Sequence, residues 1–274
     1  MSSLCEVVVV DDPAATVADL LAAAAREGGH IVLTGGSTSA DAYEIAAERQ
    51  PDWSRTQLWW GDERCVPADD ERSNYGMAKR TLLDRLDAQP AAVHRMRGEL
   101  GRDAGAEDYD RELGDLARFD LVLLGLGPDG HVASLYPDQP TLDEHERRVL
   151  GAEAKLEPYV DRITLTLPML RAAHAIVFLV AGEDKADAAA RAFGGEPSRA
   201  TPGSLVRAVS GTTTAVLDRA AAKRLKVRST FRRDLSRAAG RPPSRARLRE
   251  PAARGWCLRR VRLRGTLSAL RSPR

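Results

Sequence analysis

Short apolar segments that alternate with helical patterns constrain the fold of this chain most strongly. VVVV, LVLL and AIVFLV are apolar at every position, which is typical of strands buried on both faces of a parallel sheet. We predict strands at 6–10, 31–34, 57–60, 119–124, 162–167, 175–181 and 212–217. We predict helices at 14–27, 40–49, 74–86, 103–117, 185–192 and 219–225. The alternation predicts an α/β fold with an open, mostly parallel, Rossmann-like sheet and helices on both faces.

Charge divides the 274 residues into two parts. Residues 226–274 contain 16 basic and 2 acidic side chains, a net +14, whereas residues 1–225 carry a net −12. The overall 43% hydrophobic content can bury a sizeable core, so we expect one domain at 1–225. For the basic C-terminal extension three interpretations stay open: a disordered segment, an arginine-rich arm that binds nucleic acid, or an out-of-frame reading of GC-rich DNA.

Several classes of protein lack support in the sequence. No segment approaches the roughly 18 apolar residues of a membrane span, and no basic region precedes an apolar one at the N-terminus, so we expect a cytoplasmic protein without a membrane partner. Cys5, Cys65 and Cys257 lie far apart without C-x-x-C spacing. We find neither a G-x-S-x-G elbow nor an H-E-x-x-H motif, and we expect no metal and no other cofactor.

The segment LTGGSTSADAYE, residues 33–44, joins a predicted strand to a predicted helix through two glycines. Gly35 and Gly36 allow the backbone to approach an anion closely, and Ser37 and Thr38 add hydroxyl donors. The following helix directs its unpaired N–H groups and its dipole at the same point. The segment is no P-loop because G-K-[S/T] is missing, yet it has what a phosphate site needs. A purely structural turn is the alternative.

The segment GLGPDGHVASLYP, residues 125–137, matches G-x-G-x-x-G but does not predict a dinucleotide site. Such a site needs a crossover helix after the glycines, and Pro137 and Pro140 leave no room for one. The segment instead presents His131 at the end of a buried strand. This histidine can serve as a general base, Asp129 can orient it, and the glycine N–H groups, including that of Gly127, can stabilise an oxyanion.

Further charged residues fall at predicted strand ends. WWGDER is followed by SNYGMAK, so Arg64, and then Ser73 and Asn74 at a helix start, lie near the edge where open α/β sheets bind ligands. Arg162 opens one strand and Lys185 opens one helix at similar edges. Each could contact an anionic substrate, or each could be an ordinary surface charge or helix cap.

Taken in order, these motifs resemble the 6-phosphogluconolactonase family, the lactone hydrolases of the oxidative pentose phosphate pathway. The resemblance covers nearly all of residues 1–225. It rests on TGGST, WWGDER with SNYGMAK, DLVLLGLGPDGHVASLYP, RITLTLPML, AGEDKADA, TPGSLVR and LDRAAAKRL. The related glucosamine-6-phosphate deaminases typically have D-E-Y and D-G-H-I-A-F-N-E-P segments. The segments D-E-R at 62–64 and H-V-A-S-L at 131–135 match the pattern of the lactonases instead.

The resemblance implies hydrolysis of 6-phospho-D-glucono-1,5-lactone. His131 would activate the water that attacks C1, and Asp129 would tune this histidine. The phosphate and the sugar oxygens would be bound by the following residues: Gly35, Gly36, Ser37, Thr38, Arg64, Ser73, Asn74, Gly127, Arg162 and Lys185. The implied partner is a small sugar phosphate, with nucleic acid contacted only through the basic tail, and the chain is expected to be a monomer or weak homodimer.

Two features depart from the family pattern. Ser39 stands where the family usually has proline, and serine is compatible with the first turn of a helix. The family also ends near Leu225, and nothing in it matches residues 226–274.

Overall fold

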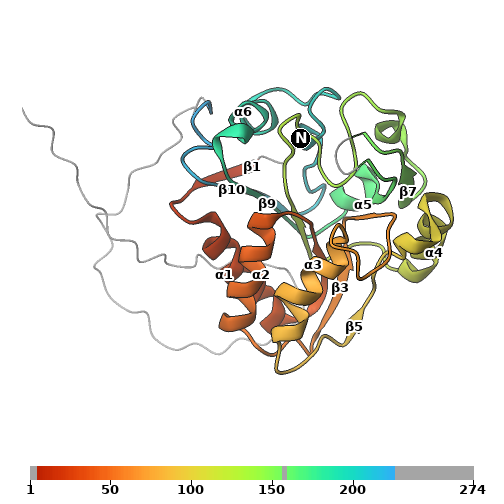
Figure 1. Ribbon diagram of the computed structural model, residues 1–274. Helices are drawn as coiled ribbons and strands as arrows, with labels where there is room; N and C mark the ends of the chain where they lie inside the picture. The colour runs from red at the N-terminus through yellow and green to blue at the C-terminus, as the bar shows by residue number, and fades with distance from the viewer. Residues whose placement is uncertain (1–4, 156–158, 226–274) are drawn as a thin grey trace, which may run out of the picture. The chain divides into compact units, whose positions relative to one another are not determined.

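The core of the protein is a sheet of seven parallel strands in the computed structural model, which describes residues 5–155 and 159–225 (Figure 1). All pairings in this sheet are parallel. The strand order is β1 (Cys5–Val9), β10 (Thr212–Leu217), β9 (Ala175–Val180), β6 (Leu121–Leu124), β2 (Gly29–Leu33), β3 (Thr56–Trp60) and β5 (Ala92–Val93). The prediction of an open, mostly parallel sheet is confirmed.

A second, three-stranded sheet is antiparallel. It consists of β4 (Asp62–Arg64), β8 (Arg162–Leu165) and β7 (Val149–Ala152). The α-helices are α1 (Pro13–Glu27), α2 (Ser37–Arg49), α3 (Asn74–Thr81), α4 (Arg102–Leu113), α5 (Leu167–Arg171) and α6 (Ala186–Gly194). Short 3₁₀ turns are η1 (Leu83–Arg85), η2 (Gly98–Leu100), η3 (Pro140–Asp143), η4 (Glu183–Lys185) and η5 (Pro202–Ser204).

The local sequence explains why α1 begins and ends where it does. The Asp12 side chain accepts a hydrogen bond of 2.8 Å from the N–H of Ala15, and Pro13 occupies the first helical position, where no N–H is needed. At the other end Gly28 adopts φ 83°, and its N–H bonds the carbonyl of Ala24. Eight of the fifteen residues are buried, so the helix is held by packing of its alanine-rich face.

The main sheet is covered on both faces. Helices α1 and α2 pack against each other and against β9 on one face. On the other face, alternate residues of β6 and β9 pack with α5, α6 and the small sheet. This core cluster includes Val122, Leu124, Ile176, Phe178, Val180, Ile163, Leu170, Ala188, Ala189 and Ala192. The period of two along each strand divides the side chains between the two layers.

Two buried tyrosines fix strand ends that lie near each other in the sheet. The Tyr43 hydroxyl accepts from the N–H of Thr34 and donates to its carbonyl, both at 2.8 Å. The Tyr109 hydroxyl makes the same pair of bonds to Trp60, at 2.8 and 3.2 Å. Burial raises the pKa of both hydroxyls, so they remain protonated donors. Each tyrosine thus satisfies backbone groups that the sheet leaves unpaired.

Some predicted elements need correction. The predicted helix at 219–225 is wrong: the chain forms turns there, in which Asp218 accepts from the N–H of Ala221 at 2.6 Å and the bonds do not continue as a helical ladder. A segment of seven residues is too short to be held by helix propensity alone. The predicted strand at 162–167 ends at Leu165 and belongs to the antiparallel sheet. A helix with Pro168 in its first turn begins at Leu167.

The predicted extension at 226–274, with its proposed boundary after Leu225, lies outside the described residues. Within the described part of the chain, no helix is long and apolar enough to cross a membrane.

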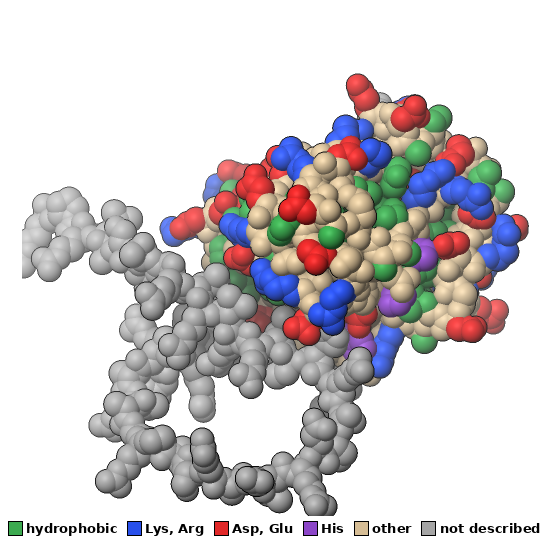
Figure 2. All heavy atoms as spheres, turned by 90° about the horizontal axis from the view of Figure 1, so that it is seen from below, with side chains coloured by type: hydrophobic (Ala, Val, Ile, Leu, Met, Phe, Trp, Pro, Cys, Tyr) green, Lys and Arg blue, Asp and Glu red, His purple; other side chains and the backbone are tan. Residues whose placement is uncertain are grey.

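Charge on the described surface is mixed. Acidic and basic side chains are interspersed over the face drawn in Figure 2. Exposed ion pairs such as Arg49 with Asp19 and Arg85 with Glu44 accompany this mixture. Such pairs contribute little to stability individually. On this face the net negative charge of residues 1–225 is not gathered into one acidic field.

The two buried tyrosines give a test of the fold. Tyr43→Phe and Tyr109→Phe each leave a backbone N–H and carbonyl unpaired, so each should lower the free energy of unfolding by about 1–3 kcal/mol. Urea denaturation measures the change. Tyr159→Phe is the matched control, since Tyr159 is 69% exposed and should change stability little. Equal stability of all three variants and the parent would contradict the assigned role.

Candidate active site

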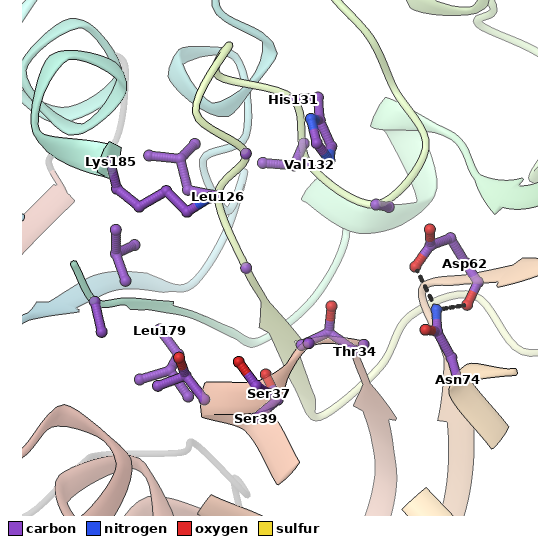
Figure 3. A pocket seen from close by; sticks show the side chains of 18 of the residues that line it. Thr34, Ser37, Ser39, Asp62, Asn74, Leu126, His131, Val132, Leu179 and Lys185 are labelled. Carbon is purple, nitrogen blue, oxygen red and sulfur yellow. Dashed lines mark hydrogen bonds between the residues drawn. The ribbon is translucent and has the colours of Figure 1, made fainter. Parts of the chain in front are cut away.

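A cavity of about 290 Å³ lies at the carboxyl ends of β2, β6 and β9 (Figure 3). After β2 the chain next enters this sheet at β3, which lies on one side of the pair formed by β2 and β6. After β6 it next enters the sheet at β9, on the other side of that pair, so the strand order reverses between β2 and β6. Open α/β sheets bind ligands at such a switch point. The lining consists of Thr34, Gly35, Gly36, Ser37, Thr38, Ser39, Asp62, Arg64, Asn74, Gly125, Leu126, Gly127, Pro128, His131, Val132, Ala133, Leu179, Val180, Ala181 and Lys185.

One wall of the cavity is the start of α2. Gly36 occupies the N-cap with φ 107°, a conformation that favours glycine, and no side chain caps the helix. The first turn contains no acidic residue, and Ser37 and Thr38 add hydroxyls at the same place. Unpaired N–H groups, hydroxyls and the helix dipole together form an anion-binding geometry. Ser39, the departure from the family pattern, also lines the cavity.

Opposite this wall lies the turn that carries His131. Nδ1 of His131 lies 2.6 Å from Oδ1 of Asp129, and the same oxygen accepts from the N–H of His131 at 3.0 Å. Gly127 permits this arrangement, because a Cβ there would lie 2.0 Å from Nδ1 of the imidazole. Gly130 adopts φ 99° between the two residues. The glycines of this motif therefore shape a tight turn around the imidazole. The prediction that the Gly127 N–H stabilises an oxyanion is wrong, because this N–H donates to the carbonyl of His131 at 2.9 Å, and the N–H of Gly130 donates to the carbonyl of Gly127 at 2.9 Å.

The ionisation of Asp129 fixes the imidazole tautomer. Partial burial raises the pKa of this carboxyl, but the hydrogen bonds and charge of His131 lower it by more, so the net pKa lies below the ordinary value. A carboxylate can only accept hydrogen bonds, so Nδ1 must carry the proton in this contact. In the neutral ring Nε2 is then an unprotonated base, and His131 lines the cavity.

The segment that contains Thr201 and Gly203, together with α6, also holds the turn that carries His131. The sequence motifs assigned neither of them a role in the site. The carbonyl of Gly130 accepts from the N–H of Gly203 at 2.9 Å. Arg191 of α6 donates to the carbonyl of Asp129 at 3.2 Å and to the hydroxyl of Thr201 at 3.1 Å. The only signal in the sequence was the family-like TPGSLVR segment, which carries no chemistry of its own.

Glu63 organises the segment between β4 and α3. Its buried carboxylate accepts from the hydroxyl of Ser73 at 2.9 Å and from the N–H groups of Asn74 and Tyr75 at 2.8 Å each. Burial raises the pKa of Glu63, while these hydrogen bonds oppose the shift. Ser73 also accepts from the N–H of Gly76 as the N-cap of α3. Ser73 is thus buried as a cap and does not line the cavity, whereas Asn74 does.

The three predicted cations occupy different positions. Arg64 and Lys185 line the cavity, and Figure 3 shows the Lys185 side chain together with His131 on the side away from Ser37. Arg64 also donates to the carbonyl of Arg72. Arg162 is paired across the sheet with Arg64 in the strand register but is only 3% exposed and does not line the cavity. The structure therefore brings two of the three predicted cations to the cavity.

Asp62 completes the polar lining. It is 8% exposed, and its carboxylate accepts from Nδ2 of Asn74 at 3.1 Å (Figure 3). The sequence motifs place the segment WWGDER near the edge that binds ligands, but they assign Asp62 itself no role. Among the described residues, no group of three or more histidine, cysteine, aspartate or glutamate side chains could hold a metal ion.

The comparisons with known proteins agree with this geometry. The family model of glucosamine-6-phosphate isomerases/6-phosphogluconolactonase matches residues 6–215. The chain is 43% identical to the 6-phosphogluconolactonase of Mycobacterium leprae over 195 residues, which cover 66% of this chain and 79% of the relative. It is 40% identical to that of Streptomyces coelicolor over 222 residues, covering 74% and 85%.

A solved structure of 6-phosphogluconolactonase from Trypanosoma cruzi superposes with a TM-score of 0.72 at 26% identity, covering 82% of this chain and 98% of that one. The resemblance noted in the sequence motifs is confirmed by these matches. The chain belongs to the family of glucosamine-6-phosphate isomerases and 6-phosphogluconolactonases.

Proposed function

We propose that this chain hydrolyses 6-phospho-D-glucono-1,5-lactone to 6-phospho-D-gluconate in the oxidative pentose phosphate pathway, with His131 as the general base. One observation carries the proposal. A histidine whose Nδ1 is bonded to a carboxylate lines the same cavity as an uncapped helix N-terminus. The first feature suits activation of water, and the second suits binding of a phosphate. The names of the relatives support the same reaction.

The proposed reaction needs one base that returns its proton. Nε2 of His131 removes a proton from water while the resulting hydroxide adds to C1 of the lactone. The tetrahedral intermediate then collapses, the bond from C1 to the ring oxygen breaks, and the imidazolium returns the proton to that oxygen. Asp129 holds the imidazole in the required tautomer and stabilises its charged form. Water and the lactone are the only reactants consumed.

The phosphate in this proposal is held at the start of α2. The N–H groups after Gly36 and the hydroxyls of Ser37 and Thr38 donate to its oxygens, and Lys185, on the opposite wall of the same cavity, adds positive charge. Arg64 supplies a second cation on the cavity lining. We expect these groups to bind the phosphate about equally in the ground state and the transition state, which lowers KM without raising kcat.

Replacing the base tests the proposal most simply. His131→Ala should lower kcat for freshly prepared 6-phospho-D-glucono-1,5-lactone by about 10²–10⁴-fold, because general base catalysis contributes that much. The rate of acid release is measured after subtraction of spontaneous hydrolysis. His145→Ala is the control, since His145 is exposed and does not line the cavity. If His131→Ala is as fast as the parent, the proposed mechanism is wrong.

Asp129→Asn separates orientation from proton transfer. The amide can donate to Nδ1 and so favour the wrong tautomer, which leaves Nε2 protonated. We expect kcat to fall by about 10²-fold or more while KM changes little, as measured by steady-state kinetics. An unchanged kcat would show that the Asp129 contact has no part in catalysis.

The same variant has a signature in pH-dependent stability. A carboxyl whose pKa is lower in the folded than in the unfolded protein stabilises the fold above its unfolded pKa, and this stabilisation is lost as pH falls through the folded pKa. The parent should therefore be more stable than Asp129→Asn at pH 7. Urea denaturation should show the difference shrinking as the pH is lowered from about 4. A constant difference across that window would refute the assignment of a lowered pKa.

Lys185→Met tests the phosphate site. Loss of one charge-assisted contact worth about 1.5–3 kcal/mol should raise KM about 10- to 100-fold and leave kcat nearly unchanged. Lys223→Met is the matched control, because Lys223 is exposed and pairs with Glu183. If Lys185→Met has the KM of the parent, Lys185 does not bind the phosphate.

A further inference from the structure

We propose that Asp62 is a positioning residue, which fixes the His131 turn to the small sheet through Ser134 and joins it to the phosphate-binding loop through Asn74. The inference rests on the proposed function of the cavity. It concerns a contact between two segments that are far apart in the sequence. Oδ2 of Asp62 accepts a hydrogen bond of 2.7 Å from the Ser134 hydroxyl, 72 residues away.

The turn after His131 needs an external anchor. Val132 and Leu135 form an isolated antiparallel bridge, and Ala133 between them has φ 48°, which is uncommon for a residue with a Cβ. A residue held in this region is maintained by the surrounding structure. Ser134 follows directly and is 1% exposed, so its N–H and its hydroxyl must find partners inside the protein.

Both partners of Ser134 come from the small antiparallel sheet. Asp62 of β4 and Thr164 of β8 are direct cross-strand neighbours. Asp62 accepts the Ser134 hydroxyl, and Oγ1 of Thr164 accepts the Ser134 N–H at 3.2 Å. Thr164 is fully buried and donates onward to the carbonyl of Leu165 at 3.1 Å. The pairing of β4 with β8 therefore brings together the two hydrogen-bond partners of Ser134, which lies three positions after His131.

The other carboxylate oxygen of Asp62, Oδ1, is hydrogen-bonded to a residue that packs on the proposed phosphate-binding loop. Nδ2 of Asn74 donates to Oδ1 of Asp62 at 3.1 Å and to the Asp62 carbonyl at 2.9 Å (Figure 3). Asn74 in turn packs on Gly35, where a Cβ would lie 2.1 Å from its Oδ1. Asp62 thus lies between the His131 turn and the loop that begins α2. One carboxylate sets the position of the base relative to the place where the phosphate binds.

The geometry separates a positioning role from a direct catalytic one. If Asp62 acts by holding Ser134 and Asn74, an asparagine can replace it: its Oδ1 accepts from Asn74, and its Nδ2 donates to the Ser134 oxygen. If the carboxylate itself takes a proton or binds the substrate through its charge, asparagine fails. Ser134 does not line the cavity, so its removal perturbs the substrate only through the turn.

The experiment compares Asp62→Ala, Asp62→Asn, Ser134→Ala and the double variant Asp62→Ala/Ser134→Ala in the full chain. Ser134→Ala and Asp62→Ala should each lower kcat about 10- to 100-fold through misplacement of the base, and Ser134→Ala should leave KM nearly unchanged. The double variant should be no slower than Asp62→Ala, because the two changes break the same hydrogen bond between Asp62 and Ser134. Asp62→Asn should recover most of the kcat lost in Asp62→Ala.

Thr56→Val is the matched control for loss of a buried hydroxyl. Thr56 is fully buried, donates to the carbonyl of Trp53 at 2.8 Å, and begins β3 at the end of the strand away from the cavity. This variant should lose stability without losing kcat. A Ser134→Ala variant with parental kcat, effects of Asp62→Ala and Ser134→Ala that multiply, or an Asp62→Asn variant as slow as Asp62→Ala would each overturn the proposal.

A second readout does not depend on activity. Amide hydrogen exchange in peptides covering residues 129–136 should accelerate in Ser134→Ala and in Asp62→Ala, and it should stay parental in Thr56→Val. Unchanged exchange in this segment would also overturn the positioning role. If the parent fails to hydrolyse the lactone, the proposed function falls, and the exchange measurement still decides whether Asp62 anchors the turn.

Discussion

The parallel register of β2, β6 and β9 is the constraint on which the rest of the structure depends. Because these strands are adjacent and parallel, the loops that follow them meet at one edge of the sheet. The first loop starts α2, the second carries His131, and the third carries Lys185. Anion-binding and basic groups that lie up to 150 residues apart thus line one cavity.

Glycine and buried carboxylates then shape that edge in different ways. Gly127 and Gly35 are needed because His131 and Asn74 pack directly against their backbones. Glu63 and Asp62 accept hydrogen bonds from Ser73, Asn74 and Tyr75 at the start of α3, so this part of the cavity wall is held by hydrogen bonds as well as by apolar packing. Such preorganised groups keep the geometry that a positioned base and a bound phosphate require.

Features that depend on neighbouring residues in the sequence could be predicted, and features that depend on long-range contacts could not. The α/β alternation, the glycine turn that joins β2 to α2 and the pair of Asp129 and His131 were predictable, because strand, helix and turn signals lie within a few residues of one another. The small antiparallel sheet was not predictable, since β4 and β8 pair across about 100 residues and β4 has only three. For the same reason the contact between Asp62 and Ser134 carried no local signal. The wrong helix at 219–225 shows that helix-forming residues alone do not extend a helix.

We infer that this cavity belongs to a lactonase, although the family also contains enzymes that act on glucosamine 6-phosphate. The most direct test presents both substrates to the same preparation of the full chain. We expect hydrolysis of freshly made 6-phospho-D-glucono-1,5-lactone well above the spontaneous rate and no release of ammonia from glucosamine 6-phosphate. Ammonia release without acceleration of lactone hydrolysis would contradict this inference.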